Sequence, residues 1–88
     1  MTPGQVAEWM LSELERSDFL DQGVAVFHIK ENFGKEFVYE NEAGNLAISR
    51  KVLDEFKKRT KDTIVWDRGQ RHWRKRQNYD PKNKRQAD

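Results

Sequence analysis

The segment that most restricts the fold is a strand, turn, strand pattern over residues 63–75. Residues 63–66 (Thr-Ile-Val-Trp) are rich in β-branched and aromatic side chains, and residues 71–75 (Arg-His-Trp-Arg-Lys) form the returning strand. The turn between them contains Gly69, which is expected to adopt a positive φ. A cross-strand pair of Trp66 and Trp73 is expected to lock this β-hairpin onto the preceding helices.

A helix-start signal opens the chain. Thr2 is the predicted N-cap, Pro3 suits the first helical position, and Gln5 can close a capping box with Thr2. The helix is expected to extend to about Arg16. One face carries an apolar stripe made of Val6, Met10 and Leu14, with Trp9 alongside.

Residues 22–33 favour a second helix. Asp21 is its predicted N-cap and Gly34 the residue just beyond its end, so that Ala25, Ile29 and Phe33 share one face. The same segment is rich in residues that favour strands, and a short apolar run cannot be assigned by periodicity alone. A strand over these residues therefore stays open as the alternative.

Two short apolar runs, residues 37–39 and 46–48, flank a turn-rich spacer. They predict two short strands or an extended loop. Ser49 then caps a third helix over residues 50–59, whose opposite face is strongly basic. The buried face of this helix is expected to contain Val52, Leu53 and Phe56.

Length and composition set the class of the protein. Eighty-eight residues make one domain, and an aromatic content of 11% can supply a small core. The elements predict an α+β domain over residues 1–76, followed by a basic, flexible tail over residues 77–88. The absence of cysteine excludes disulfides and thiolate metal sites. With no signal peptide and no long apolar stretch, we expect a cytoplasmic protein that does not enter a membrane.

Charge is distributed unevenly along the chain. Residues 1–44 carry three basic and nine acidic side chains, a net −6, whereas residues 45–88 carry fourteen and six, a net +8. Cations interleaved with aromatic rings suit contacts with phosphates and bases, so the basic half is a candidate nucleic-acid surface. The candidate residues lie on the third helix and the hairpin: Arg50, Lys51, Lys57, Lys58, Arg68, Arg71, Arg74, Lys75 and Arg76.

Each basic cluster also has a simpler explanation. The cations of the third helix can be the solvated face of an amphipathic helix, which we favour for that element. In the hairpin, contact with a polyanion and protection of an exposed strand edge explain the arginines equally well. The acidic half suggests that the chain binds another protein or a second copy of itself. The sequence therefore leaves DNA, RNA, another protein and homodimerisation open.

No catalytic constellation can be assembled from the sequence. The only histidines, His28 and His72, lie in separate elements, and neither belongs to a zinc-binding helix motif. The serines lack a nucleophile-elbow context, and the five glycines do not cluster into a phosphate-binding loop. The sequence predicts a non-enzymatic protein with no metal, no cofactor and no small-molecule substrate.

The order helix, helix, extended segment, basic helix and β-hairpin resembles a winged helix-turn-helix over residues 3–76. Residues 50–59 would take the recognition position and residues 63–75 would form the wing. The resemblance departs in one place: about fifteen residues separate Gly34 from Arg50, where a helix-turn-helix has a turn of roughly 3 to 4 residues.

Four segments, residues 2–10, 33–39, 44–48 and 65–74, are similar to a family of small uncharacterised bacterial proteins. Such proteins occur as free-standing reading frames and in mobile gene pools such as integron cassettes. The resemblance implies a compact α+β, winged-helix-like fold. It implies no assigned activity, so no catalytic residue follows from it.

Overall fold

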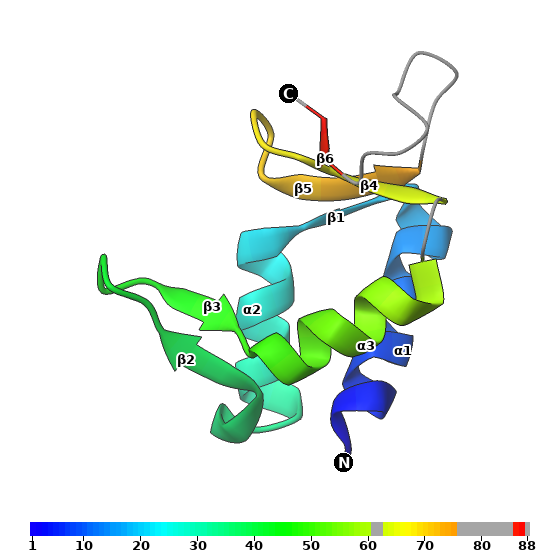
Figure 1. Cartoon of the computed structure of the whole chain (residues 1–88). Helices are drawn as coiled ribbons and strands as arrows, with labels where there is room; N and C mark the ends of the chain where they lie inside the picture. Colours follow the sequence, from blue (N-terminus) through cyan, green and yellow to red (C-terminus); the bar gives the residue numbers. More distant parts are fainter. Residues whose placement is uncertain (61–62, 76–85, 88) are drawn as a thin grey trace.

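The computed structural model describes residues 1–60, 63–75 and 86–87 and has an α+β architecture (Figure 1). Three helices lie on one side of a four-stranded sheet, and a two-stranded sheet stands apart beside the second helix (Figure 1). The elements are α1 (Pro3–Ser17), β1 (Phe19–Asp21), α2 (Gln22–Asn32), the 3-10 helix η1 (Lys35–Phe37), β2 (Val38–Glu40), β3 (Leu46–Ile48), α3 (Arg50–Thr60), β4 (Ile64–Asp67), β5 (His72–Lys75) and β6 (Gln86–Ala87).

The first two helices begin at their predicted caps. The Thr2 hydroxyl accepts the N–H of Gln5 at 3.2 Å, and the Gln5 side chain accepts the N–H of Thr2 at 2.8 Å. At α2, the Asp21 carboxylate accepts the N–H of Val24 at 3.1 Å, and Gly34 follows the helix with a φ of 119°. The helix prediction for this segment is confirmed, and the strand alternative is wrong.

Strand β1 is an element that the sequence analysis missed. Asp18 ends α1 with a φ of 70°, and the next three residues pair antiparallel with β5, placing buried Leu20 opposite Trp73. The sheet order is β1-β5-β4-β6, so β1 lies beside the hairpin (Figure 1). A strand of three residues is too short to show alternation, which explains why it left no signal.

The predicted hairpin is confirmed, including its aromatic pair. Trp66 lies opposite Trp73, and their ring centroids are 4.8 Å apart. Trp73 also meets the ring of Phe56 edge-on, with centroids 5.5 Å apart. The aromatic pair therefore joins the hairpin to α3, as expected.

The turn of the hairpin differs from the expectation. The positive φ predicted at Gly69 is wrong; Arg71 has a φ of 55° instead. Residues other than glycine, asparagine and aspartate rarely adopt this left-handed backbone conformation. The Arg71 carbonyl accepts the N–H of Gln22 at 3.1 Å, which fixes the hairpin tip against the start of α2.

The connection between α2 and α3 is folded. It contains η1 and an antiparallel hairpin of β2 and β3, so the two short strands predicted there are confirmed. The Asn41 side chain closes the turn by accepting the N–H groups of Ala43 and Asn45, both at 3.0 Å. The Ser49 hydroxyl accepts the N–H of Val52 at 3.4 Å, as expected for the cap of α3.

The core lies between the helices and the sheet. Trp9 stacks on His28 with ring centroids 4.2 Å apart, and this contact joins α1 to α2. The largest fully buried apolar side chains come from all three helices, β3 and β4: Val6, Met10, Leu14, Ile29, Ile48, Val52, Phe56 and Val65. The stripes predicted for the helices therefore face the core, although Leu53 and Phe33 are only half-buried.

The C-terminal end of the described chain is β6, which pairs in parallel with β4. The remaining residues of the predicted tail, 77–85 and 88, lie outside the described residues. Within the described chain, no helix has the length and apolar character needed to cross a membrane.

Candidate nucleic-acid interface

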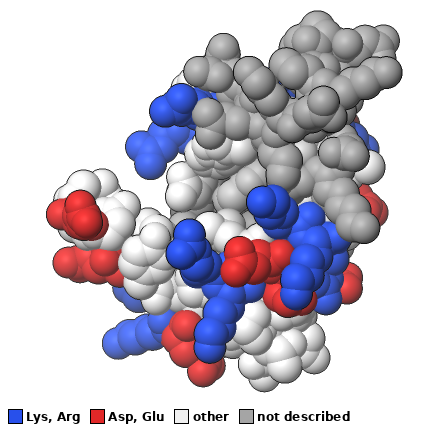
Figure 2. Space-filling model, viewed as in Figure 1, with Lys and Arg blue, Asp and Glu red and all other residues white. Residues whose placement is uncertain are grey.

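The structure places the predicted cations on two elements that pack together, α3 and the β4–β5 hairpin. Side chains of opposite charge are interspersed over α3, so its Lys and Arg residues do not form one continuous patch (Figure 2). Arg76 lies outside the described residues. The other candidates are Arg50, Lys51, Lys57 and Lys58 on α3, and Arg68, Arg71, Arg74 and Lys75 in the hairpin.

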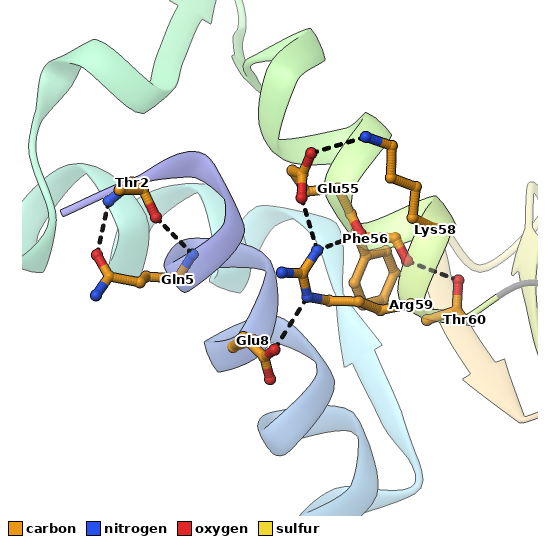
Figure 3. Close-up of polar contacts among 8 residues, drawn as sticks. All are labelled: Thr2, Gln5, Glu8, Glu55, Phe56, Lys58, Arg59 and Thr60. Atoms are coloured by element: carbon orange, nitrogen blue, oxygen red, sulfur yellow. Dashed lines mark hydrogen bonds and ion pairs between the residues drawn. The ribbon is translucent and has the colours of Figure 1, made fainter.

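The C-terminal half of α3 is engaged in ion pairs (Figure 3). Arg59 Nη1 lies 2.8 Å from Glu55 Oε1, and its Nε lies 3.1 Å from Glu8 Oε1 of α1. Lys58 Nζ lies 3.1 Å from Glu55 Oε2. The Glu8 contact fastens α3 to α1, and all three contacts reduce the positive charge that this end of the helix presents.

Two hairpin cations are also paired. Arg74 Nε donates to Asp67 Oδ2 at 3.4 Å, within the same hairpin. Lys75 Nζ donates to Asp18 Oδ1 at 2.9 Å, beside the start of β1. The carboxylates that hold Arg74 and Lys75 give these cations a structural role, which the sequence analysis did not assign to them.

Four candidate cations are exposed and make no ion pair within the part of the chain that the structure describes: Arg50, Lys51, Lys57 and Arg71. Three of them lie on α3, and two of these occupy its first turn. These residues are the strongest candidates for contact with an external anion.

The first turn of α3 is an unusual place for cations. The N-terminus of a helix carries a partial positive charge, and acidic side chains are favoured there. Of the three described α-helices, α3 is the one that begins with two cations, Arg50 and Lys51, and its first turn contains no acid. Ser49 accepts the N–H of Val52. The positive charges of Arg50 and Lys51, together with the backbone N–H groups of these two residues, favour an anion at this end.

Hydrogen bonds and ion pairs lower the pKa of three carboxylates. The bond from Arg16 lowers the pKa of Glu13, and the bonds from Arg59 and Lys58 lower the pKa of Glu55. The N–H of Gln70, followed by Arg74, lowers the pKa of Asp67. A carboxylate with a lowered folded-state pKa stabilises the fold above its ordinary pKa, and this contribution is lost as the pH falls through the lowered value.

We therefore expect the melting temperature to fall as the pH is lowered from about 5 towards 2. In Asp67→Asn, the melting temperature should be lower than that of the wild type at pH 7. It should also depend less on pH below about 5, because the asparagine amide is not protonated in this range, whereas the carboxylate of Asp67 is. Thermal unfolding followed by circular dichroism measures both effects. Asp54→Asn is the matched control, since Asp54 is exposed and makes no ion pair among the described residues. An equal effect of both substitutions would contradict this role for Asp67.

A small groove of about 300 Å³ lies between α3 and the hairpin. Leu53, Lys57 and the two tryptophans Trp66 and Trp73 line it. The tryptophans are half-buried and in contact with each other, so their main role is the predicted cross-strand packing. The exposed parts of their rings lie next to Lys57, within the candidate interface.

The sequence analysis missed a second hollow, which lies between α2, β3 and the hairpin tip. Its apolar side chains include Phe27, which is 66% exposed, and Leu46, which is 43% exposed. The exposure of Phe27 could have been predicted from the sequence. Ala25 and Ile29 lie on the buried face of α2, and Phe27 lies on the opposite face, towards solvent. The meeting of α2 and β3 depends on the tertiary fold and had no sequence signal.

The described residues contain no group of three or more His, Asp or Glu side chains placed to hold a metal ion. In comparisons with known proteins, a family model described as a family of unknown function, DUF6953, matches residues 2–75. Comparisons with curated proteins and with solved structures give no significant match.

Proposed function

The chain belongs to the DUF6953 family, a family of unknown function, and we propose that it is a winged-helix-like module that binds nucleic acid through backbone phosphates. In this proposal, the exposed cations of α3 and the hairpin tip contact phosphates and read no base sequence. The protein needs no catalytic residue or cofactor for this role. We also place it in the bacterial cytoplasm, among small proteins of the integron-cassette kind.

One observation carries the proposal: Arg50 and Lys51 occupy the first turn of α3 without an acidic partner among the described residues. A cation at a helix N-terminus interacts unfavourably with the helix dipole, and each of the two destabilises the helix by about 0.3–1 kcal/mol. A phosphate placed there would meet both charges and the backbone N–H groups of Arg50 and Lys51. In helix-turn-helix proteins, the N-terminal residues of the recognition helix are also those that enter the DNA groove.

The arrangement of elements supports the winged-helix part of the proposal. Three α-helices precede the β4–β5 hairpin (Figure 1). The hairpin packs against the third helix through Trp73 and Phe56. The β2–β3 hairpin occupies the place of the short turn in a helix-turn-helix. We therefore propose that the N-terminal end and outer face of α3 contact the phosphates, without the docking geometry that a short turn between two helices gives a helix-turn-helix.

The paired cations would assist more weakly. Exposed ion pairs contribute little to stability, so Lys58 can leave Glu55 for a phosphate at small cost. Arg74 and Asp67 are more enclosed, with side chains that are 16% and 21% exposed. We expect Arg74 to remain in place and to support the hairpin.

The test is a fluorescence-anisotropy titration against duplex DNA, single-stranded DNA and structured RNA at several salt concentrations. The informative variant replaces Arg50, Lys51 and Lys57 with glutamine. We expect the wild type to lose affinity linearly with the logarithm of salt concentration. If all three side chains meet duplex phosphates, the variant's slope should be smaller by about 2.7, because each lost contact removes about 0.9.

The matched control replaces Arg16, Lys30 and Lys35 with glutamine. This variant has the same net charge as the first, but its substitutions are on α1, α2 and η1 and not on α3 or the β4–β5 hairpin. It should keep the wild-type salt slope. Equal effects in the two variants would show a response to net charge alone, and absence of binding at about 50 mM salt would remove the proposal.

Protein binding is the second candidate function. Three apolar side chains at the outer face of α2 and the nearby β3 are substantially exposed: Val24, Phe27 and Leu46. Isolated exposed apolar residues are common, but Phe27 and Leu46 line the same hollow. Replacing Arg50, Lys51 and Lys57 leaves these three apolar side chains in place, so the two functions can be tested separately.

A further inference from the structure

We propose that the hollow between α2, β3 and the hairpin tip binds a short acidic segment of a partner protein that inserts one large apolar side chain. This inference does not depend on the proposed nucleic-acid function. It follows from the apolar floor of the hollow, from the charges on its walls and from the backbone of Arg71.

The outer face of α2 is more apolar than the domain itself requires. Ala25, Val26 and Ile29 already bury the inner face of this helix. Val24 and Phe27, which are 63% and 66% exposed, contribute little to the core. A surface helix usually carries polar residues on its outer side, so these positions favour an external contact.

The hollow has a suitable size and floor for one anchoring side chain. Its volume is about 580 Å³, and Val26, Phe27 and Leu46 supply its apolar part. Pockets of roughly 300–1,000 Å³ are typical of binding sites for small ligands. A leucine, phenylalanine or tryptophan side chain together with neighbouring backbone would fill it, and such anchors dominate the energy of protein interfaces.

The charges at the hollow favour an acidic segment. Lys30 and Arg71 line it, and neither makes an ion pair within the described chain. The hollow also contains one carboxylate, Asp21, which accepts the N–H of Val24 as the cap of α2. Two unpaired cations beside an apolar floor complement a large apolar residue flanked by aspartate or glutamate.

A long polyanion fits this hollow less well. The β2–β3 hairpin that forms one side carries Glu40 and Glu42, and acidic side chains are visible over that hairpin in Figure 2. These charges repel a phosphate chain passing over the hairpin. A short peptide can place its acidic groups at Lys30 and Arg71 without crossing the hairpin.

The backbone of Arg71 provides an independent indication. This residue has a φ of 55°, where glycine or asparagine would be less strained. Its carbonyl holds the start of α2 through the N–H of Gln22, so the strained residue also forms a wall of the hollow. An arginine kept in this conformation, at a cost of about 1–3 kcal/mol, favours a role for its side chain in binding.

The first experiment selects peptides from a phage-displayed library of random dodecapeptides against the full chain. We expect the enriched peptides to share a large apolar residue flanked by acidic residues. A synthetic peptide of the consensus sequence should then lose affinity at least about tenfold for Phe27→Ala, which corresponds to about 1.4 kcal/mol, and also for Lys30→Glu. Phe19→Ala is the matched control, since Phe19 is an exposed phenylalanine outside the hollow.

Arg71→Asn separates binding from folding. Asparagine tolerates a positive φ, so this variant should melt at the wild-type temperature or above it, yet bind the consensus peptide more weakly. The variant lacking Arg50, Lys51 and Lys57 should bind the peptide normally. Failure of the nucleic-acid proposal would therefore leave this result unchanged.

Several outcomes would overturn the inference. One is a selection that enriches no motif or a basic motif. A second is a consensus peptide that shifts the amide resonances of α3 and leaves those of α2 and β3 unchanged. A third is a wild-type dimer that dissociates in Phe27→Asp, because a second copy would then be the occupant of the hollow.

Discussion

Phe56→Ala is expected to lower the free energy of unfolding by about 3–5 kcal/mol, the largest effect among our predictions. Phe56 is 2% exposed, and its ring meets Trp73 edge-on at 5.5 Å. Its removal leaves a cavity at the point where α3 supports the hairpin. A domain of this size has a total stability of roughly 5–15 kcal/mol, so a large part would be lost. Urea unfolding monitored by tryptophan fluorescence measures the change.

Phe27→Ala provides the control for Phe56→Ala. Both substitutions remove a phenylalanine ring from a helix, but Phe27 is 66% exposed and lies outside the buried core. Its stability change should remain within about 0.5 kcal/mol. Similar losses of stability in the two variants would contradict the exposure of Phe27 and would show that its ring makes a stabilising contact within the domain.

Gly34→Ala is expected to lower the free energy of unfolding by about 1–3 kcal/mol. Gly34 has a φ of 119° and a ψ of 157°, a conformation that is almost restricted to glycine. Space is not the obstacle, because a β-carbon would lie 3.5 Å from its nearest neighbour, Glu36 Oε1. The loss arises from the backbone itself, which must turn between α2 and η1. The loss corresponds to a decrease of roughly 4–24 °C in melting temperature.

Gly69→Ala is the control for the glycine prediction. Gly69 does not have a positive φ, and a β-carbon there would meet Asp67 Oδ1 at an ordinary 3.5 Å. We expect no loss of stability, or a gain of up to about 1 kcal/mol, because alanine has fewer unfolded conformations. A loss in Gly69→Ala as large as that in Gly34→Ala would show that the two backbones are equally restricted.

The helices could be predicted because their signals are local. Thr2 with Gln5 and Asp21 with Val24 form cap bonds between residues that are three positions apart. The hairpin could be predicted for the same reason, because only a short turn separates the two strands that carry Trp66 and Trp73. In each case the physical cause lies within a few neighbouring residues.

The remaining features depend on residues that are far apart in the chain. The pairing of β1 with β5 joins residues 19–21 to residues 72–74, and the ion pair of Glu8 with Arg59 joins α1 to α3. No local pattern specifies either contact. For the same reason, the sequence could list candidate cations but could not separate Arg50 and Lys51 from the paired Arg74. The left-handed conformation of Arg71 was missed because glycine, the usual residue there, stands two positions earlier.

The position of β1 has a consequence for how the protein opens. Strand β5 lies between β1 and β4, so the hairpin cannot separate from the domain without breaking its pairing with β1, the segment that joins α1 to α2. Local detachment of the β4–β5 hairpin would therefore disturb the helices on both sides of β1. We expect amide hydrogens of β5, α1 and α2 to exchange with water through one shared opening event, as in a single cooperative unit.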